Sequence, residues 1–139
     1  LFRLGLAVAV HSDGEMQRMT ASVAGSGTVV IAYSISGYVQ PLVEAVRIAR
    51  GYGAATIAVT APGSDLAAAA ETVISFAVPE DEQLLFRPSP TRYALIGIVD
   101  MLASATAEQL GPHVLEGLRR IKLSLNTLKV NDPRLPIGD

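Results

Sequence analysis

Residues 28–39 read TVVIAYSISGYV, and this stretch decides the fold. It opens with an uncharged, mostly β-branched run, which is typical of a strand buried on both faces of a parallel sheet. Hydroxyl side chains and a glycine follow directly, at Ser34, Ser36 and Gly37. An apolar-periodic segment then begins at Val39, and Pro41 suits the first turn of a helix. The sequence therefore predicts a strand, a short hydroxyl-bearing loop and the N-terminus of a helix.

A loop of this kind has the chemistry of an anion site. The first backbone N–H groups of a helix have no intrahelical partner, and the helix dipole places partial positive charge there. Serine hydroxyls add hydrogen-bond donors without adding charge. We therefore expect a phosphate or a carboxylate to bind at this loop. Its candidate ligand-binding residues are Ser34, Ile35, Ser36, Gly37 and Val39.

Strand and helix patterns alternate along the first part of the chain. Strands are predicted over residues 6–10, 28–33, 55–60 and 73–78, and helices over residues 14–24, 39–52 and 64–70. This alternation predicts an α/β fold with a doubly wound, mainly parallel sheet and flanking helices. Ligands of such sheets bind beyond the carboxyl ends of the strands. Ser34 directly follows one predicted strand and Thr60 ends the next, which makes Thr60 a further candidate, although Thr60 and Ser64 could equally be turn formers.

Two longer helices are predicted after the sheet, over residues 91–110 and 114–130. We assign residues 1–112 to the α/β domain and residues 113–139 to a C-terminal helix and tail of the same domain. The last helix carries an apolar stripe that is too extensive for a helix facing water. We therefore predict a homodimer that forms through the long helices. The stripe consists of Leu115, Leu118, Ile121, Leu125 and Leu128.

Composition narrows the function classes. The chain has 139 residues, 50% of them hydrophobic and 17% charged, which fits one compact domain. There is no cysteine, and His11 and His113 lie far apart, so we expect no metal and no cofactor. The net charge of −2 argues against direct nucleic-acid binding, and the basic residues at 119, 120 and 122 are interpreted as a solvated helix face. Without an apolar span or a signal peptide pattern, a cytoplasmic protein is expected.

The loop Ser34-Ile35-Ser36-Gly37-Tyr38-Val39 resembles the phosphate loop of the sugar isomerase (SIS) domain, which reads roughly S-x-S-G-x-T. Both serines and the glycine match, whereas Val39 replaces the final threonine. Residues 47–54, 56–60, 62–67 and 71–79 also follow the SIS order, so the resemblance covers most of residues 4–110. It implies a three-layer, flavodoxin-like fold that binds a phosphorylated sugar.

SIS domains usually open with a helix and a strand whose glycine-rich turn forms part of the ligand site. This chain begins at Leu1 without that unit. The resemblance therefore implies that the first strand–helix unit lies in a longer protein, upstream of residue 1. The alternative is a diverged domain that never had this unit.

Two functional classes compete within this family. One is the RpiR-like transcriptional regulator, whose N-terminal helix-turn-helix domain precedes a SIS domain that senses a phosphorylated sugar. Residues 118–122 and the pair Thr91-Arg92, which opens the long helix, resemble that family. In this reading DNA is contacted only through a helix-turn-helix domain absent from the chain. Arg92 is a candidate phosphate ligand or, equally, a member of a surface ion pair.

The other class is a sugar-phosphate isomerase, similar to arabinose-5-phosphate isomerase. Isomerisation needs a base and an acid that move protons between neighbouring atoms of the sugar. Those isomerases carry a His-Gly-Asp segment ahead of the phosphate-loop strand, and the corresponding residues 17–20 here read QRMT. His11 and the acidic turn at residues 80–82 are weaker candidates, a structural histidine and a solvated turn in their simplest interpretation. We therefore predict a sensor without catalytic activity, with the isomerase as the alternative.

Overall fold

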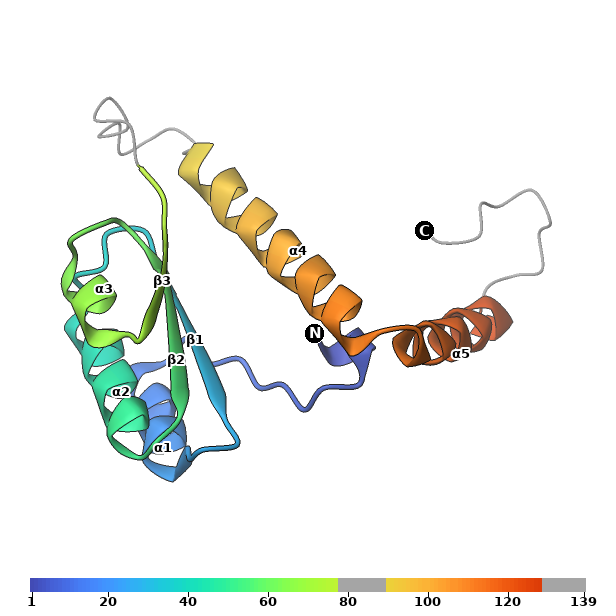
Figure 1. Ribbon diagram of the computed structural model, residues 1–139, viewed down its shortest axis with the longest axis horizontal. Coiled ribbons are helices and arrows are strands. Elements are labelled where there is room, and N and C mark those ends of the chain that lie inside the picture. The colour runs from blue at the N-terminus through green and yellow to red at the C-terminus, as the bar shows by residue number, and fades with distance from the viewer. Residues whose placement is uncertain (78–89, 129–139) are drawn as a thin grey trace. The chain divides into compact units, whose positions relative to one another are not determined.

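The computed structural model describes residues 1–77 and 90–128. The chain divides into two compact units, one of residues Val10–Ile96 and the other of Leu1–Ala9 with Gly97–Asp139. The described helices and strands are η1 (Phe2–Leu4), α1 (Gly14–Val23), β1 (Val29–Ser34), α2 (Gln40–Gly51), β2 (Ala55–Thr60), α3 (Asp65–Ala69), β3 (Thr72–Ser75), α4 (Pro90–Leu110) and α5 (His113–Leu128) (Figure 1).

The sheet of the first unit is parallel, with the strand order β1-β2-β3. In its register Ser34 lies beside Thr60, and Thr60 lies beside Ser75. The carboxyl ends of the three strands therefore share one edge of the sheet. This arrangement confirms the predicted α/β class with a parallel sheet and flanking helices, and it brings the loop after β1 next to the loop after β2.

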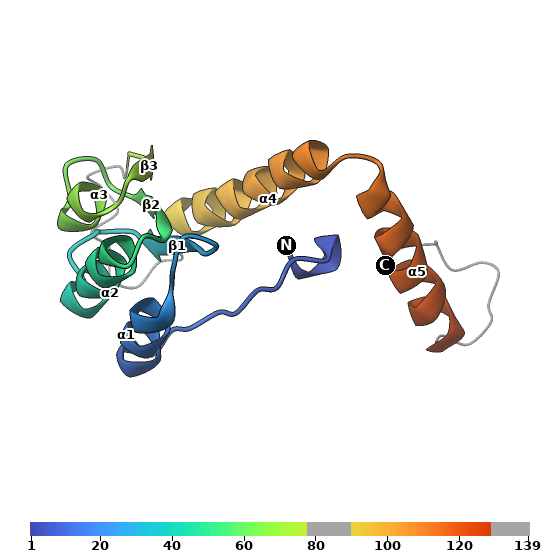
Figure 2. The same ribbon diagram turned by 60° about the horizontal axis from the view of Figure 1, so that its bottom comes forward.

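Helices α1, α2 and α3 lie on the same face of this sheet (Figures 1 and 2). Helix α2 packs on β1 and β2, α3 packs on β2 and β3, and α1 packs against α2. The helices begin at ordinary capping residues. Asp13 Oδ1 accepts a hydrogen bond from Met16 N at 3.0 Å and so caps the N-terminus of α1. Gly53, at φ 87°, follows the end of α2, a conformation that favours glycine.

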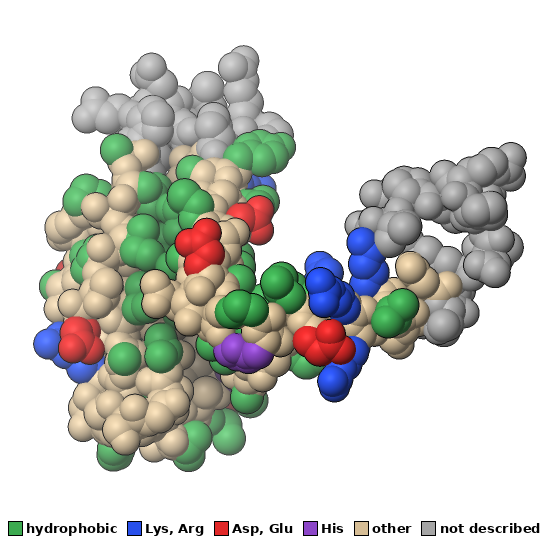
Figure 3. All heavy atoms as spheres, turned by 45° about the vertical axis from the view of Figure 1, so that its right-hand side comes forward, with side chains coloured by type: hydrophobic (Ala, Val, Ile, Leu, Met, Phe, Trp, Pro, Cys, Tyr) green, Lys and Arg blue, Asp and Glu red, His purple; other side chains and the backbone are tan. Residues whose placement is uncertain are grey.

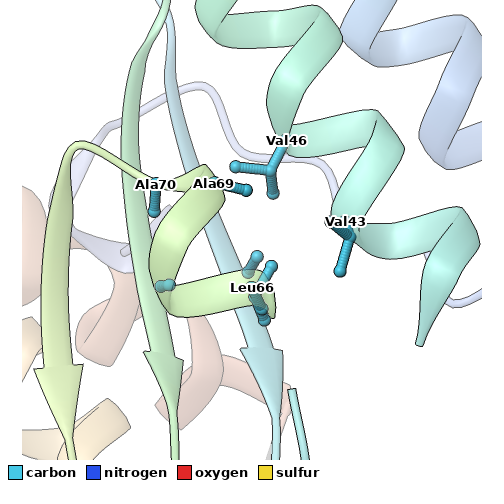
Figure 4. Close-up of a cluster of buried hydrophobic side chains, with 7 residues drawn as sticks. Val43, Val46, Leu66, Ala69 and Ala70 are labelled. Atoms are coloured by element: carbon cyan, nitrogen blue, oxygen red, sulfur yellow. The ribbon is translucent and has the colours of Figure 1, made fainter. Parts of the chain in front are cut away.

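The core between helices and sheet is built from small and medium apolar side chains. Val43 and Val46 of α2 lie with Leu66 of α3 in one cluster on this face of the sheet, and all three side chains are fully buried (Figure 4). Burying a side chain of this size contributes about 1.5–3 kcal/mol. A second cluster, in which alanines allow α1 and α2 to approach closely, consists of Ala21, Ala24, Ala45, Ala49 and Ala54. This packing fixes both the first turn of α2 and the N-terminus of α3 over the sheet edge.

The strand predicted over residues 6–10 is wrong. Those residues have no regular secondary structure, and Val10 is 89% exposed. Their apolar, β-branched composition favours a strand locally, but a strand also needs a neighbour for its hydrogen bonds. The described residues offer no such neighbour to this segment.

In the second unit, α5 packs against η1. Within the predicted stripe Leu118 and Ile121 are half-buried, whereas Leu115 and Leu125 are 54% and 50% exposed. The side chain of Leu128 and residues 129–139 lie outside the described residues. The assignment of residues 1–112 to the α/β domain and of residues 113–139 to its C-terminal helix and tail stays a prediction. Among the described helices, none is long and apolar enough to cross a membrane.

Candidate functional site

The loop between β1 and α2 is shaped by its own serines. Ser34 Oγ accepts a hydrogen bond from Gly37 N at 3.0 Å, and Ser36 Oγ accepts a weaker one from Tyr38 N at 3.4 Å. Within the described part of the chain, neither hydroxyl donates to another group. Each hydroxyl can both accept and donate, so both protons can be given to a ligand. Ser34 is half-buried and Ser36 is exposed, which leaves the loop open to one.

Gly37 packs against the N-terminus of α3 and is hydrogen-bonded to it. Its φ of 75° favours glycine, and a Cβ atom built on it would lie 2.2 Å from Ser64 Oγ. Its carbonyl oxygen accepts a hydrogen bond from Leu66 N at 2.9 Å. The loop after β1 and the first turn of α3 therefore form one structure, although they are distant in sequence.

Two buried hydroxyls lie beneath Gly37. Thr60, the last residue of β2, is 0% exposed, and Ser64, the N-cap of α3, is 1% exposed. Their oxygens are 3.4 Å apart, and Ser64 Oγ also accepts from Ala67 N at 3.3 Å. A Cβ atom on Gly37 would lie 2.5 Å from Thr60 Oγ1. The structure thus places Thr60, the last residue of β2, next to the loop and below its surface.

The N-terminus of α2 completes the site. Val39 occupies the N-cap without a side-chain hydrogen bond, and Pro41 follows in the first turn. Gln40 Nε2 donates to Asp65 Oδ2 at 3.0 Å, a bond that joins the first residues of α2 and α3. Tyr38 and Val39 are 59% and 51% exposed and form an apolar rim. Apart from the bond of Gln40 to the Asp65 carboxylate, the hydrogen bonds described for the loop involve neutral groups, so the loop itself offers hydroxyl and amide donors to an anion.

The other predicted residues are not brought to this loop by any described hydrogen bond or ion pair. Arg92 is exposed in the first turn of α4. His11 is half-buried, and its backbone oxygen accepts from Gln17 Nε2 at 3.0 Å, a structural contact with α1. Glu80, Asp81 and Glu82 lie outside the described residues. Burial raises the pKa of Tyr33, the residue before Ser34, above its ordinary value of 10.0, so this phenol stays protonated at neutral pH.

The basic cluster of α5 is a separate feature of the second unit. Figure 3 shows Lys and Arg side chains gathered along α5, where Arg119, Arg120 and Lys122 are all exposed. Arg120 Nε lies 3.3 Å from Glu116 Oε1, an i,i+4 ion pair on the helix surface. Exposed pairs of this kind contribute about 0–1 kcal/mol. The interpretation as a solvated helix face fits these contacts. No group of acidic, histidine or cysteine side chains able to hold a metal occurs among the residues described.

Sequence reasoning overlooked the contact between Gly37 and α3. The sequence does indicate where α3 begins, because Ser64 is a recognisable N-cap ahead of residues 65–69. Gln40 and the Leu66 amide carry no sequence signal of their own. Only the parallel order of β1 and β2 brings them to the same loop.

Comparison with known proteins identifies the family. Residues 4–105 match the model of the SIS domain. The chain belongs to the SIS domain family. The HTH-type transcriptional regulator HexR of Pseudomonas aeruginosa is 38% identical over 124 residues, which are 89% of this chain and 43% of that protein. HexR of Escherichia coli is 31% identical over 138 residues, 99% of this SIS domain and 47% of that protein. This SIS domain therefore spans less than half the length of these curated relatives.

Solved structures show the same fold. The Vibrio vulnificus NanR protein complexed with ManNAc-6P superposes with a TM-score of 0.81 at 20% identity, over 94% of this chain and 49% of that chain. The sugar isomerase domain of an RpiR transcription factor from Sphaerobacter thermophilus gives a TM-score of 0.71 at 24% identity, over 86% of this chain and 65% of that chain. The SIS-type α/β fold expected from the sequence is confirmed, and the regulators named above are among the proteins that this SIS domain resembles.

Proposed function

We propose that this SIS domain is the effector-binding part of an RpiR-like transcriptional regulator and that it binds a phosphorylated sugar. The observation that carries the proposal is the loop after β1, which lies at a helix N-terminus without a side-chain cap. The hydroxyls of Ser34 and Ser36 accept hydrogen bonds there but donate none to another described group, so both remain available as donors to a ligand. Phosphate suits such a site. The similarity to HexR supports the regulator, and the NanR structure is a complex with ManNAc-6P.

In this proposal the phosphate lies against residues 34–39. Ser34 and Ser36 donate through their hydroxyls, and the backbone amides of Ile35, Ser36 and Val39 add further donors. Gly37 supplies the left-handed turn that lets the backbone approach the ligand. Arg92 would add a charge-assisted bond from α4. Thr60 belongs to the site through its contact with Gly37.

The proposal includes the absence of catalysis. The segment that would match the isomerase motif lies in α1 and reads QRMT, and no described hydrogen bond or ion pair brings an acid and a base together at the loop. Purified full-length protein should therefore not interconvert aldose and ketose phosphates. Turnover that disappears on replacing His11 or Glu82 would overturn this part and favour the isomerase.

Ligand binding can be tested on the full-length protein by calorimetry with a panel of sugar phosphates. Charge-assisted hydrogen bonds contribute about 1.5–3 kcal/mol each, so a Ser34→Ala/Ser36→Ala double variant should lose roughly tenfold or more in affinity. Ser22→Ala is the matched control, because Ser22 Oγ donates to Arg18 O at 2.8 Å within α1, away from the loop. Equal affinity of the double variant and the wild type would refute the site.

We also propose a homodimer formed through α4 and α5. Large apolar side chains stand exposed on both helices, including Ile96, Met101, Leu115 and Leu125 at 59%, 64%, 54% and 50%. Self-association would cover them and give the two-fold symmetry that paired DNA half-sites require. DNA itself would be bound by a helix-turn-helix domain outside this chain, in the cytoplasm.

The dimer is tested by one charge placed on the stripe of α5. Leu125→Glu should yield a monomer in sedimentation experiments without loss of the circular dichroism of the fold. Asn126→Glu adds the same charge at the neighbouring exposed position and should leave the dimer intact. A wild type that sediments as a monomer at tens of micromolar, or a Leu125→Glu variant that stays dimeric, contradicts the proposal.

A further inference from the structure

We infer that Thr60 and Ser64 form a buried hydroxyl pair that positions the anion loop without touching the ligand. The inference rests on the proposed function for the identity of the ligand. Its geometrical part concerns the ligand-free protein and stands on three observations. They are the burial of both side chains, their mutual contact, and the close approach of Gly37 to both of them.

Burial separates these hydroxyls from those of the loop surface. Thr60 is 0% exposed and Ser64 is 1% exposed, whereas Ser36 is exposed and Ser34 is half-buried. Gly37 lies over the pair so closely that even a Cβ atom would meet Ser64 Oγ at 2.2 Å. A ligand on the open side of the loop therefore meets the serines of the loop and not Thr60.

Each hydroxyl of the pair has at least one hydrogen-bond partner. Ser64 Oγ accepts from Ala67 N, and the two oxygens lie 3.4 Å apart, so one hydroxyl donates to the other. Buried hydroxyls in native proteins are almost always paired in this way. Removing Thr60 Oγ1 leaves Ser64 to find another partner under Gly37, and this disturbs the surface on which the loop rests.

The loop is also tied to the core through the same helix turn. Gly37 O accepts a hydrogen bond from the amide of Leu66 in α3, whose side chain is fully buried in the cluster with Val43 and Val46 of α2. Gly37 is therefore held in two ways, by its close packing on Thr60 and Ser64 and by the hydrogen bond from Leu66 N. A loop held before the ligand arrives loses less conformational freedom on binding, which favours affinity.

Thr60 allows a matched pair of substitutions. Thr60→Val keeps the shape of the side chain and removes the hydroxyl, whereas Thr60→Ser keeps the hydroxyl and removes a methyl group. In full-length protein, we expect Thr60→Val to weaken binding of inorganic phosphate and of a sugar 6-phosphate about tenfold, which corresponds to ~1.4 kcal/mol. Thr60→Ser should stay within about threefold of the wild type. The reverse order would show a packing role and overturn the inference.

Hydrogen exchange of the Leu66 amide in ligand-free protein separates positioning from direct contact. Positioning predicts faster exchange in Thr60→Val and near-wild-type exchange in Thr60→Ser, because the bond to Gly37 O loosens only in the first. Weaker binding with unchanged exchange would mean that Thr60 touches the ligand, and the inference would be wrong. If the wild type binds neither phosphate probe, the proposed function fails, and the exchange rates still decide whether the pair positions the loop.

Discussion

Replacing Gly37 by alanine tests the geometry of the site most directly. The added Cβ atom would lie 2.2 Å from Ser64 Oγ, 2.4 Å from Ser64 Cβ and 2.5 Å from Thr60 Oγ1, all closer than real Cβ contacts. Inserting a methyl group into such a contact costs about 1–3 kcal/mol. The left-handed backbone, at φ 75°, adds about 1–2 kcal/mol for any residue with a Cβ. Gly37→Ala should therefore cost about 2–5 kcal/mol in free energy of unfolding.

Gly63→Ala separates the two contributions. Gly63 has a similar φ of 72°, but a Cβ atom there would meet nothing within 4 Å. This variant should lose only the backbone part, about 1–2 kcal/mol. The difference between the two variants then isolates the contact with Thr60 and Ser64. Urea denaturation followed by circular dichroism measures it, and a gap of 2 kcal/mol corresponds to a midpoint shift of roughly 1 M.

The loop could respond by moving instead of straining the fold. In that case Gly37 O would leave Leu66 N, and the loss would appear in phosphate affinity, while stability would fall less. The two measurements are therefore made on the same variants. The reasoning is refuted if Gly37→Ala and Gly63→Ala agree in both the urea midpoint and the affinity for phosphate.

Two further predictions concern helix starts. Val39→Thr supplies the N-cap of α2 with a hydroxyl that it lacks. The substitution should raise the free energy of unfolding, measured by urea denaturation, by about 0.5–2 kcal/mol. It should also tighten phosphate binding in calorimetry. Unchanged stability would mean that the first turn of α2 is already satisfied in another way. Asp13→Ala removes the hydrogen bond that caps α1 at Met16 N, so it should lower the free energy of unfolding by about 1 kcal/mol in the same denaturation assay. Asp13→Asn should keep most of the wild-type stability, because asparagine also caps helices.

The local part of the fold could be predicted from the sequence. β1, β2 and the helices α1 to α3 follow from apolar periodicity and from caps such as Asp13 and Ser64, which act within a few residues. The parallel sheet follows from their alternation. Residues 6–10 have the same kind of composition but form no strand, because pairing depends on a neighbour that local composition does not reveal.

The candidate site divides in the same way. Ser34, Ser36 and Gly37 belong to one loop, so their approach to the N-terminus of α2 could be predicted from their order alone. The contact of Gly37 with Ser64 and Leu66 depends on the register that places Ser34 beside Thr60. The sequence did not indicate that Gly37 would cover Thr60 and Ser64 so closely. The expectation that ligands bind at strand ends did single out Thr60 as a candidate.

Depth in the fold gives chemically similar hydroxyls different roles at this sheet edge. Ser34, Ser36, Thr60 and Ser64 all follow or end a strand or cap a helix, and each could donate to a phosphate. The first two remain accessible, whereas the last two are covered by a glycine that no larger residue could replace without displacing them. If an anion binds at this loop as proposed, Gly37 separates the accessible hydroxyls of Ser34 and Ser36 from the buried hydroxyls of Thr60 and Ser64. In this chain, exchanging the small residue at 37 should change the site as much as removing a serine.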